Sequence, residues 1–139
     1  GFGRVVSLVG RRLQQAGVPV LIIEDDVGLA ARLRQQGYDV LEGNAAKGAI
    51  LDAANLSAAR WLFVAIPNAF EAGQAVEQAR NANPSLEIIA RAHSDAEIDY
   101  LRQHGANLVI MGEREIARGM IEHVLGTGGD TQGAAPQPA

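Results

Sequence analysis

Short apolar runs alternate with amphipathic segments along the 139 residues of the chain. Several runs are apolar continuously rather than at every second position, which is typical of strands covered on both faces of a sheet. Five runs are expected to form strands: Val18–Ile23, Tyr38–Leu41, Trp61–Ile66, Leu86–Ala90 and Leu108–Met111.

Apolar side chains spaced three or four residues apart predict helices between these strands. The predicted apolar faces consist of Val5, Leu8, Val9 and Leu13; of Leu29 and Leu33; of Ile50, Leu51 and Ala54; of Ile98 and Leu101; and of Ile116, Met120 and Val124. Gly17, Gly37 and Gly105 each follow a helical pattern and fit a left-handed cap. Ser94 and Glu97 have the spacing of a capping box.

Strands and helices alternate with short connections, which predicts an α/β fold with a parallel sheet and right-handed crossovers. The pattern is that of a Rossmann-like doubly wound sheet, whose strand order 3-2-1-4-5-6 places the first strand in the middle. Every element except that first strand is found from Gly1 onward. We therefore expect an N-terminally truncated domain. An apolar strand should precede Gly1, and without it two neighbouring strands would expose unpaired backbone.

Two regions differ in composition. Residues 1–125 contain all the predicted strands and helices and are expected to form one domain. Residues 126–139 contain six Gly or Pro residues among fourteen and almost no apolar bulk. This tail is expected to be disordered.

Composition and charge argue against several classes of function. Twelve basic and sixteen acidic residues give a net charge of −4, which disfavours nucleic-acid binding. The chain has no cysteine, and its three histidines share no metal-ligand spacing, so no metal site is expected. No apolar run approaches the length of a membrane span, and no segment resembles a signal peptide, so we expect a cytosolic domain.

The sequence GFGRVV at residues 1–6 contains two of the three glycines of the dinucleotide-binding pattern G-x-G-x-x-G. Gly1 permits a tight turn, Gly3 lets a phosphate approach the backbone, and Val6 replaces the third glycine. A phosphate would face amides at a helix N-terminus, and Arg4 would add a permanent positive charge. Two glycines alone are equally consistent with an ordinary turn.

Glu24 ends the LIIE strand, 21 residues after Gly3. A carboxylate at this place accepts hydrogen bonds from a ribose hydroxyl in doubly wound folds, and it disfavours the 2′-phosphate of NADP. Asp25 and Asp26 follow directly, so a group of solvated acids at a strand end is the alternative interpretation.

Two further loops follow strands that end at the same edge of the predicted sheet, where ligands bind. The GNAA segment contributes Asn44 and Ala45, whose alternative role is a simple turn with an Asn helix cap. Ile66, Pro67 and Asn68 end the next strand, and termination of that strand by the proline is the alternative interpretation.

Arg91 and Glu113 are candidates at the far half of the sheet. Arg91 follows the LEIIA strand and is either a contact for a ligand phosphate or a surface ion-pair partner. Glu113 opens the last helix, where an acid is favourable for the helix dipole alone. No catalytic triad, paired buried acids or metal-ligand set accompanies them, so the sequence predicts a binding protein and not an enzyme.

Six segments together resemble the regulator-of-potassium-conductance (RCK, or TrkA-N) domain: GFGRVV, LIIE, GNAA, AIPNAFEAG, IIARAHSDAE and GANLVIMGEREIARGM. The resemblance covers residues 1–125 without large gaps. It is to the version found at the C-terminus of Kef-type monovalent cation:proton antiporters, especially the YbaL-like group.

The resemblance implies a regulatory domain on the cytoplasmic face of an inner-membrane transporter. It implies that the domain pairs as a homodimer, binds an adenine nucleotide such as AMP, NAD(H), ATP or ADP, and gates potassium or other monovalent cation:proton antiport. A hydrophobic transport domain would lie upstream. The nucleotide contacts that it implies, together with the residues above, are Gly1, Phe2, Gly3, Arg4, Val5, Glu24, Asp25, Asn44, Ala45, Ile66, Pro67, Asn68, Arg91 and Glu113.

Some positions depart from the family pattern, and two other functions stay open. Asn44 stands where many family members have Asp, and Val6 stands where a third glycine is usual. The stripe of Ile116, Met120 and Val124 is a candidate dimer surface, with core packing as the alternative. The other functions are the cofactor-binding half of an NAD-dependent oxidoreductase and a stand-alone RCK subunit of a potassium channel or transporter.

Overall fold

The computed structural model describes residues 2–43 and 53–126 and contains the predicted alternation of strands and helices, with one further helix, Ala69–Ala82, for which no apolar face was predicted. In chain order the elements are α1 (Phe2–Gln15), β1 (Leu21–Glu24), α2 (Val27–Gln35), β2 (Asp39–Glu42), α3 (Ala53–Ala58), β3 (Trp61–Val64), α4 (Ala69–Ala82), β4 (Glu87–Ala92), α5 (Asp95–His104), β5 (Leu108–Met111) and α6 (Gly112–Leu125). The first strand begins later than predicted, after Pro19, which has no N–H for a sheet.

Several predictions fall outside the described residues. These are the helix face at Ile50 and Leu51, the site residues Gly1, Asn44 and Ala45, and the disordered tail, of which residues 127–139 are not described.

The five described strands form one parallel sheet in the order β2-β1-β3-β4-β5. This confirms the Rossmann-like fold class, because the order is the doubly wound order with its first strand left out. The structure differs from prediction at the centre, where β1 pairs directly with β3 and Leu21 lies opposite Leu62. The expected unpaired backbone on two neighbouring strands was therefore wrong, since β1 and β3 satisfy each other's main-chain groups. The strand expected before Gly1 stays a prediction.

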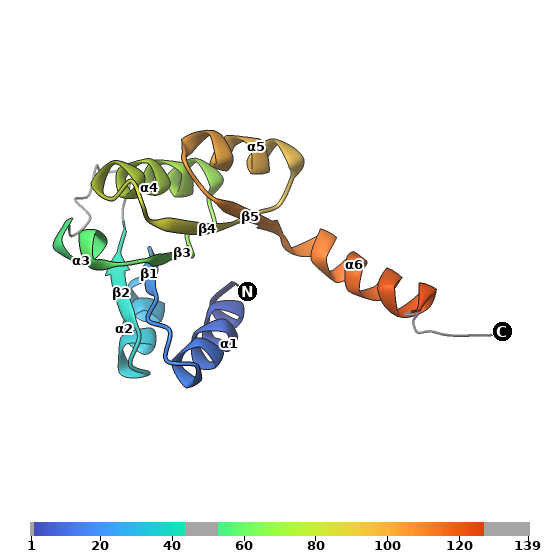
Figure 1. Ribbon diagram of the computed structural model, residues 1–139, viewed down its shortest axis with the longest axis horizontal. Helices are drawn as coiled ribbons and strands as arrows, with labels where there is room; N and C mark the ends of the chain where they lie inside the picture. Colours follow the sequence, from blue (N-terminus) through green and yellow to red (C-terminus); the bar gives the residue numbers. More distant parts are fainter. Residues whose placement is uncertain (1, 44–52, 127–139) are drawn as a thin grey trace.

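Helices cover both faces of the sheet, and each face has its own apolar cluster (Figure 1). On one face α4 and α5 pack over a cluster that includes Ile23 and Leu101. On the other face α1 and α2 contribute Val6 and Leu33 to a smaller cluster around Ile22. Successive strand residues point to opposite faces, so the neighbours Ile22 and Ile23 are both fully buried but in different clusters.

The first helix packs through different side chains from those predicted. Val6 is 1% exposed, whereas Leu8, which was expected on the apolar face, is 63% exposed. Gly10 explains the closeness of the contact, because a Cβ at this position would lie 2.8 Å from Cε1 of Tyr38. Gly10 and Val6 therefore lie on the side of α1 that faces the cluster containing Tyr38.

The predicted helix ends are confirmed in most details. Positive φ angles of 73°, 92° and 120° occur at Gly17, Gly37 and Gly105. Ser94 caps α5 by accepting a hydrogen bond from the Glu97 amide at 3.2 Å. The return bond of the predicted capping box is displaced by one residue, since the Glu97 carboxylate accepts from the His93 amide.

The last helix, α6, extends away from the sheet and has no buried residue (Figure 1). The side chains of its apolar stripe, Ile116, Met120 and Val124, are 62%, 65% and 80% exposed. Core packing of this stripe, the alternative interpretation of the sequence, is therefore wrong for the described chain.

Candidate functional site

The carboxyl ends of β1, β2 and β3 lie together at one point. In doubly wound folds, ligands bind outside the carboxyl ends of the strands. The amide of Gly43 donates to the carbonyl oxygen of Glu24 at 3.0 Å. A Cβ at Gly43 would lie 2.7 Å from Cγ2 of Ile23 and 3.5 Å from Cδ1 of Ile66. Only glycine fits at position 43. Because Gly43 has no side chain, the ends of the three strands can pack together.

Glu24 lies at this point and is 3% exposed. Its Oε2 atom accepts a hydrogen bond from the Asp26 amide at 2.9 Å. Burial raises the pKa of the Glu24 carboxyl group, the neighbouring Asp25 also raises it, and the Asp26 amide opposes the shift. A carboxylate has about four acceptor positions, so acceptor capacity remains for a ligand hydroxyl.

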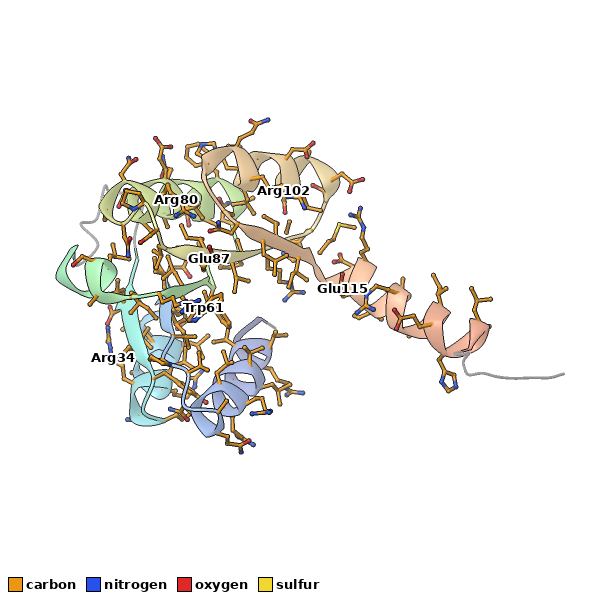
Figure 2. All side chains as sticks on the ribbon, viewed as in Figure 1. Arg34, Trp61, Arg80, Glu87, Arg102 and Glu115 are labelled. Atoms are coloured by element: carbon orange, nitrogen blue, oxygen red, sulfur yellow. The ribbon has the colours of Figure 1, made fainter. Side chains whose placement is uncertain are left out.

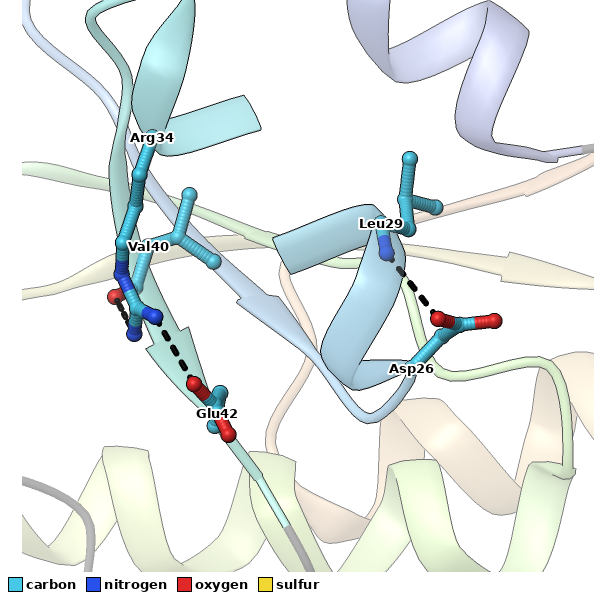
Figure 3. A network of polar contacts seen from close by, with 5 residues as sticks. All are labelled: Asp26, Leu29, Arg34, Val40 and Glu42. Atoms are coloured by element: carbon cyan, nitrogen blue, oxygen red, sulfur yellow. Dashed lines mark hydrogen bonds and ion pairs between the residues drawn. The ribbon is translucent and has the colours of Figure 1, made fainter. Parts of the chain in front are cut away.

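The two acids after Glu24 have different surroundings. Asp25 is exposed, and Asp26 caps α2 by accepting from the Leu29 amide at 2.9 Å (Figure 3). The alternative of solvated acids therefore fits Asp25 and Asp26 but not Glu24.

A contact that the sequence analysis missed holds the end of β2. The Arg34 guanidinium donates to the Glu42 carboxylate at 2.7 Å and to the Val40 carbonyl oxygen at 2.9 Å (Figure 3). These bonds tie the last turn of α2 to the strand that leads into Gly43. The spacing of eight residues across a helix–strand turn is not a periodic signal, so sequence patterns did not reveal it.

The loop after β3 contains three residues that were predicted to contact a nucleotide, and they lie in different surroundings. Ile66 is buried at 3% exposure, so its side chain packs in the core. Pro67 and Asn68 are exposed. Asn68 caps α4, because its Oδ1 atom accepts from the Glu71 amide at 3.0 Å. The side-chain amide nitrogen of Asn68 is the group left for a ligand.

The first turn of α1 differs from the loop predicted for the glycine motif. Helix α1 begins at Phe2, so Phe2 and Gly3 have helical backbone rather than a turn before the helix. Arg4 is exposed on the same turn, and Val5 is 45% exposed.

A second group of predicted residues lines an apolar cavity of about 430 Å³ between α1, the strands β3–β5 and the start of α6. Val5, Phe63 and Ile110 are typical of its walls, and Arg91 and Glu115 are its charged lining residues. Figure 2 labels Glu115 at the start of α6. Thus Val5 and Arg91 share one cavity, and Glu24 does not line it.

Arg91 is half-buried and reaches the junction of β5 and α6. Its Nη2 atom lies 3.1 Å from the position that a Cβ at Gly112 would take. Glu113, one residue on, is exposed in the first turn of α6. The two candidates therefore lie on neighbouring segments, but only Arg91 lines the cavity.

Two kinds of feature are absent from the described part of the chain. Among residues 2–43 and 53–126, no group of three or more His, Asp or Glu side chains is arranged to hold a metal ion. No helix in that part of the chain combines the length and apolar character needed to cross a membrane.

Comparison with known proteins places the chain in a family. The model of the TrkA-N domain matches residues 1–112. The chain belongs to the TrkA-N domain family.

Two relatives are cation transport proteins by name. The chain is 48% identical over 122 residues to YbaL of Escherichia coli (strain K12), named as a cation/proton antiporter, and covers 22% of that protein. It is 34% identical over 122 residues to the glutathione-regulated potassium-efflux protein KefC of Salmonella paratyphi B, and covers 19% of it. Each match takes in 88% of the present chain, which therefore spans about a fifth of the length of these relatives.

Solved structures agree with this assignment. The TrkA-N domain of the inner membrane protein YbaL from Escherichia coli matches with a TM-score of 0.74 at 48% identity, over 89% of this chain and 92% of that chain. The NAD(P)-binding domain of an exopolyphosphatase-related protein from Archaeoglobus fulgidus matches with a TM-score of 0.68 over 90% of this chain and 93% of that chain. At 16% identity the second match shows a shared fold alone.

Proposed function

We propose that this chain is a regulatory domain that binds an adenine nucleotide, AMP or NAD(H) with ATP and ADP as further candidates, and gates potassium or other monovalent cation:proton antiport. It acts on the cytoplasmic face of an inner membrane, attached to or associated with the transporter. Membership of the TrkA-N family supports this proposal, as do the names of the relatives, which are cation transport proteins.

The observation that carries the proposal is the buried carboxylate of Glu24 at the meeting point of three strand ends. A buried acid in an apolar fold costs free energy unless it has partners, and the backbone amides of Asp26 and Asp25 use only part of the acceptor capacity of a carboxylate. The two hydroxyls of a ribose are suitable donors for that capacity. Phosphate would then lie towards the first turn of α1, where Arg4 and the amides of Phe2 and Gly3 are the candidates.

Gating requires that nucleotide bind two arrangements of the domain with different affinity. A coupling of about 1–3 kcal/mol, typical of allosteric systems, changes affinity by about 5–150-fold. A homodimer with two alternative arrangements supplies such states. The exposed apolar stripe of α6 supports pairing, because contiguous apolar surface on a soluble domain marks an interaction site.

Titration of the full-length natural protein with AMP and NADH tests the nucleotide assignment. Calorimetry should give saturable binding that the substitution Glu24→Ala weakens at least about tenfold, because hydrogen bonds to a charged group contribute about 1.5–3 kcal/mol each. The control is Asp39→Ala, which removes an exposed acid at the amino end of β2 and should leave affinity unchanged.

Cation flux in vesicles tests the gating. Nucleotide should change the flux of the parent protein and leave the flux of Glu24→Ala unaltered at the same concentration. Equal affinity of parent and Glu24→Ala for both nucleotides, with the variant folded by circular dichroism, contradicts the assigned ribose contact.

A further inference from the structure

The first helix carries a face whose charge is opposite to that of the rest of the protein. Residues 1–23 contain three arginines and no Asp or Glu, a formal charge of +3. Because the whole chain carries −4, the residues from 24 onward carry −7. All three arginines, Arg4, Arg11 and Arg12, lie on α1 and are exposed.

These arginines surround an exposed leucine. Leu8 is four residues from both Arg4 and Arg12 and three residues from Arg11, and side chains at these spacings are neighbours on a helix surface. Leu8 is 63% exposed. It lies about 200° around the helix from Val6, the residue by which α1 packs on the core, so the face points away from the domain.

No internal partner neutralises this face within the described part of the chain. Helix α1 has no acidic residue of its own. The ion pairs of the described residues involve Arg34, His104, Arg114 and Arg118, and none of the three arginines of α1.

We propose that the basic face of α1, defined as Arg4, Leu8, Arg11 and Arg12, binds the anionic headgroups of a phospholipid membrane. A ring of cations around one apolar side chain matches a lipid surface, where the guanidinium groups contact phosphate and the leucine enters the headgroup boundary. The inference takes from the proposed function only the place of the domain beside a membrane, and it does not depend on nucleotide binding.

Net negative charge does not prevent this contact. At physiological ionic strength the Debye length is about 8 Å, so acids elsewhere on the domain are largely screened from the surface that α1 touches. The three arginines lie within about 12 Å along the helix, at about 1.5 Å per residue. The local charge therefore decides the interaction.

An acidic surface on a second copy is the other partner that charge alone allows. Helix α6 carries three acids, of which Glu115 and Glu122 already pair with Arg118 at 3.0 Å and 2.6 Å, so Glu113 is the one exposed acid of this helix outside those pairs. Protein acids also do not explain an exposed leucine at the centre of the basic face. The lipid surface fits both features.

Vesicle flotation with the 139-residue chain tests the proposal. Vesicles of phosphatidylcholine with one-third phosphatidylglycerol should bind the chain at physiological ionic strength, where the Debye length is about 8 Å, whereas pure phosphatidylcholine or 0.5 M salt should not. The double substitution Arg11→Gln/Arg12→Gln should weaken binding about 25-fold, since each arginine near an anionic membrane contributes about a fivefold factor. Leu8→Gln should weaken it as well.

The matched control removes two charges elsewhere. Arg60→Gln/Arg102→Gln changes the net charge equally, on exposed residues outside α1, and should bind vesicles like the parent. The proposal is overturned if this control loses as much vesicle binding as the α1 variant. It is also overturned if the parent binds vesicles equally with and without phosphatidylglycerol. A change in oligomer size of the α1 variant without a change in flotation assigns the face to a second copy and also overturns it.

The same variants separate this inference from the proposed function. Arg11→Gln/Arg12→Gln should keep its nucleotide affinity, because both residues lie at least about 10 Å along α1 from Arg4. Glu24→Ala should lose nucleotide affinity and float like the parent. A failure of the membrane-binding test therefore does not contradict nucleotide binding, and a failure of the nucleotide-binding test does not contradict membrane binding.

Discussion

At the scale of single residues, two polar side chains are buried in the described part of the chain, Glu24 and Asn83. Both polar atoms of the Asn83 side chain have hydrogen-bond partners. Its amide nitrogen donates to the carbonyl oxygens of Leu56 and Ala59 at 2.8 Å and 3.0 Å. Its Oδ1 accepts from the amide and the hydroxyl of Ser85. The buried carboxylate of Glu24 accepts from the amide of Asp26, with the Asp25 amide as a further donor, and keeps acceptor capacity for a ligand. Buried polar groups are normally satisfied, so Asn83 is structural and Glu24 is the candidate for binding.

Substitution of Asn83 should destabilise the domain. Asn83→Ala leaves the carbonyl oxygens of Leu56 and Ala59 without their donor in a buried place, at a cost of about 2–4 kcal/mol in the free energy of unfolding. Urea denaturation measures the loss. Asn81→Ala, two residues earlier and exposed, is the control and should change stability by less than about 0.5 kcal/mol. Equal stability of the two variants would contradict the assigned network.

Glu24 should make stability depend on pH with a defined sign. Its pKa in the folded protein lies above the ordinary value of 4.5, so the folded state holds this proton more tightly than the unfolded chain. The parent should therefore lose stability as pH rises from about 4.5 through the folded pKa. Glu24→Gln stays neutral and should lack this loss. Urea denaturation of both proteins at several pH values measures the difference, and a difference that is independent of pH contradicts the raised pKa.

At the scale of elements, α4 and α5 pack closely because a glycine lies between them. A Cβ at Gly73 would lie 2.3 Å from Cε2 of Tyr100, and the Tyr100 ring also stacks on Phe70 with ring centroids 6.4 Å apart. Arg80 joins the same layer to the loop before β5, because its guanidinium donates to the Gly105 carbonyl oxygen and to Asn107. Position 73 therefore sets the distance between the two helices on this face of the sheet.

Gly73→Ala should lower the free energy of unfolding by about 1–2 kcal/mol. Overpacking against Tyr100 costs about 1–3 kcal/mol, and the higher helix propensity of alanine returns up to about 1 kcal/mol. Gly119→Ala is the matched control, since a Cβ there meets nothing within 4 Å and only the propensity gain applies. Thermal denaturation should show opposite signs for the two variants, and a stabilised Gly73→Ala contradicts the close contact.

At the scale of the whole molecule, one helix lacks a covering surface. The sheet and its five other described helices enclose the two apolar clusters, whereas α6 extends from the β5 edge (Figure 1). The side chains of its apolar stripe are exposed. Ile121 and Leu125 are exposed beside the stripe at 55% and 80%. A helix of fourteen residues is marginal by itself in water, so its stability is expected to come from a partner.

Hydrogen exchange at two protein concentrations should reveal that partner. Amides of β1 and β3, at the centre of the sheet, should be protected at any concentration, and amides of α6 should gain protection as concentration rises. Met120→Glu places a charge in the stripe and should abolish the gain and yield a monomer by sedimentation. Protection of α6 that does not change with concentration contradicts the proposed homodimer.

Much of the fold could be predicted because its signals are local. Alternating apolar runs and helical periods gave all five described strands, and the short connections gave their parallel direction, since crossovers of this kind permit little else. Glycine caps at Gly17, Gly37 and Gly105 followed from single residues. The place of Glu24 at a strand end was also predicted, because Glu24 directly follows an apolar run in the sequence.

The sequence by itself thus determined which segments are strands, how they run and which acid ends the first described strand. Only the tertiary structure decided that β1 pairs with β3, that Val6 and not Leu8 packs in the core, and that Asp26 is a cap while Glu24 is buried. The same holds for Arg91, which shares an apolar cavity with Val5 instead of joining Glu24. The physical reason is that pairing, burial and cavities depend on contacts between segments far apart in the chain, and residue spacing carries no record of those contacts.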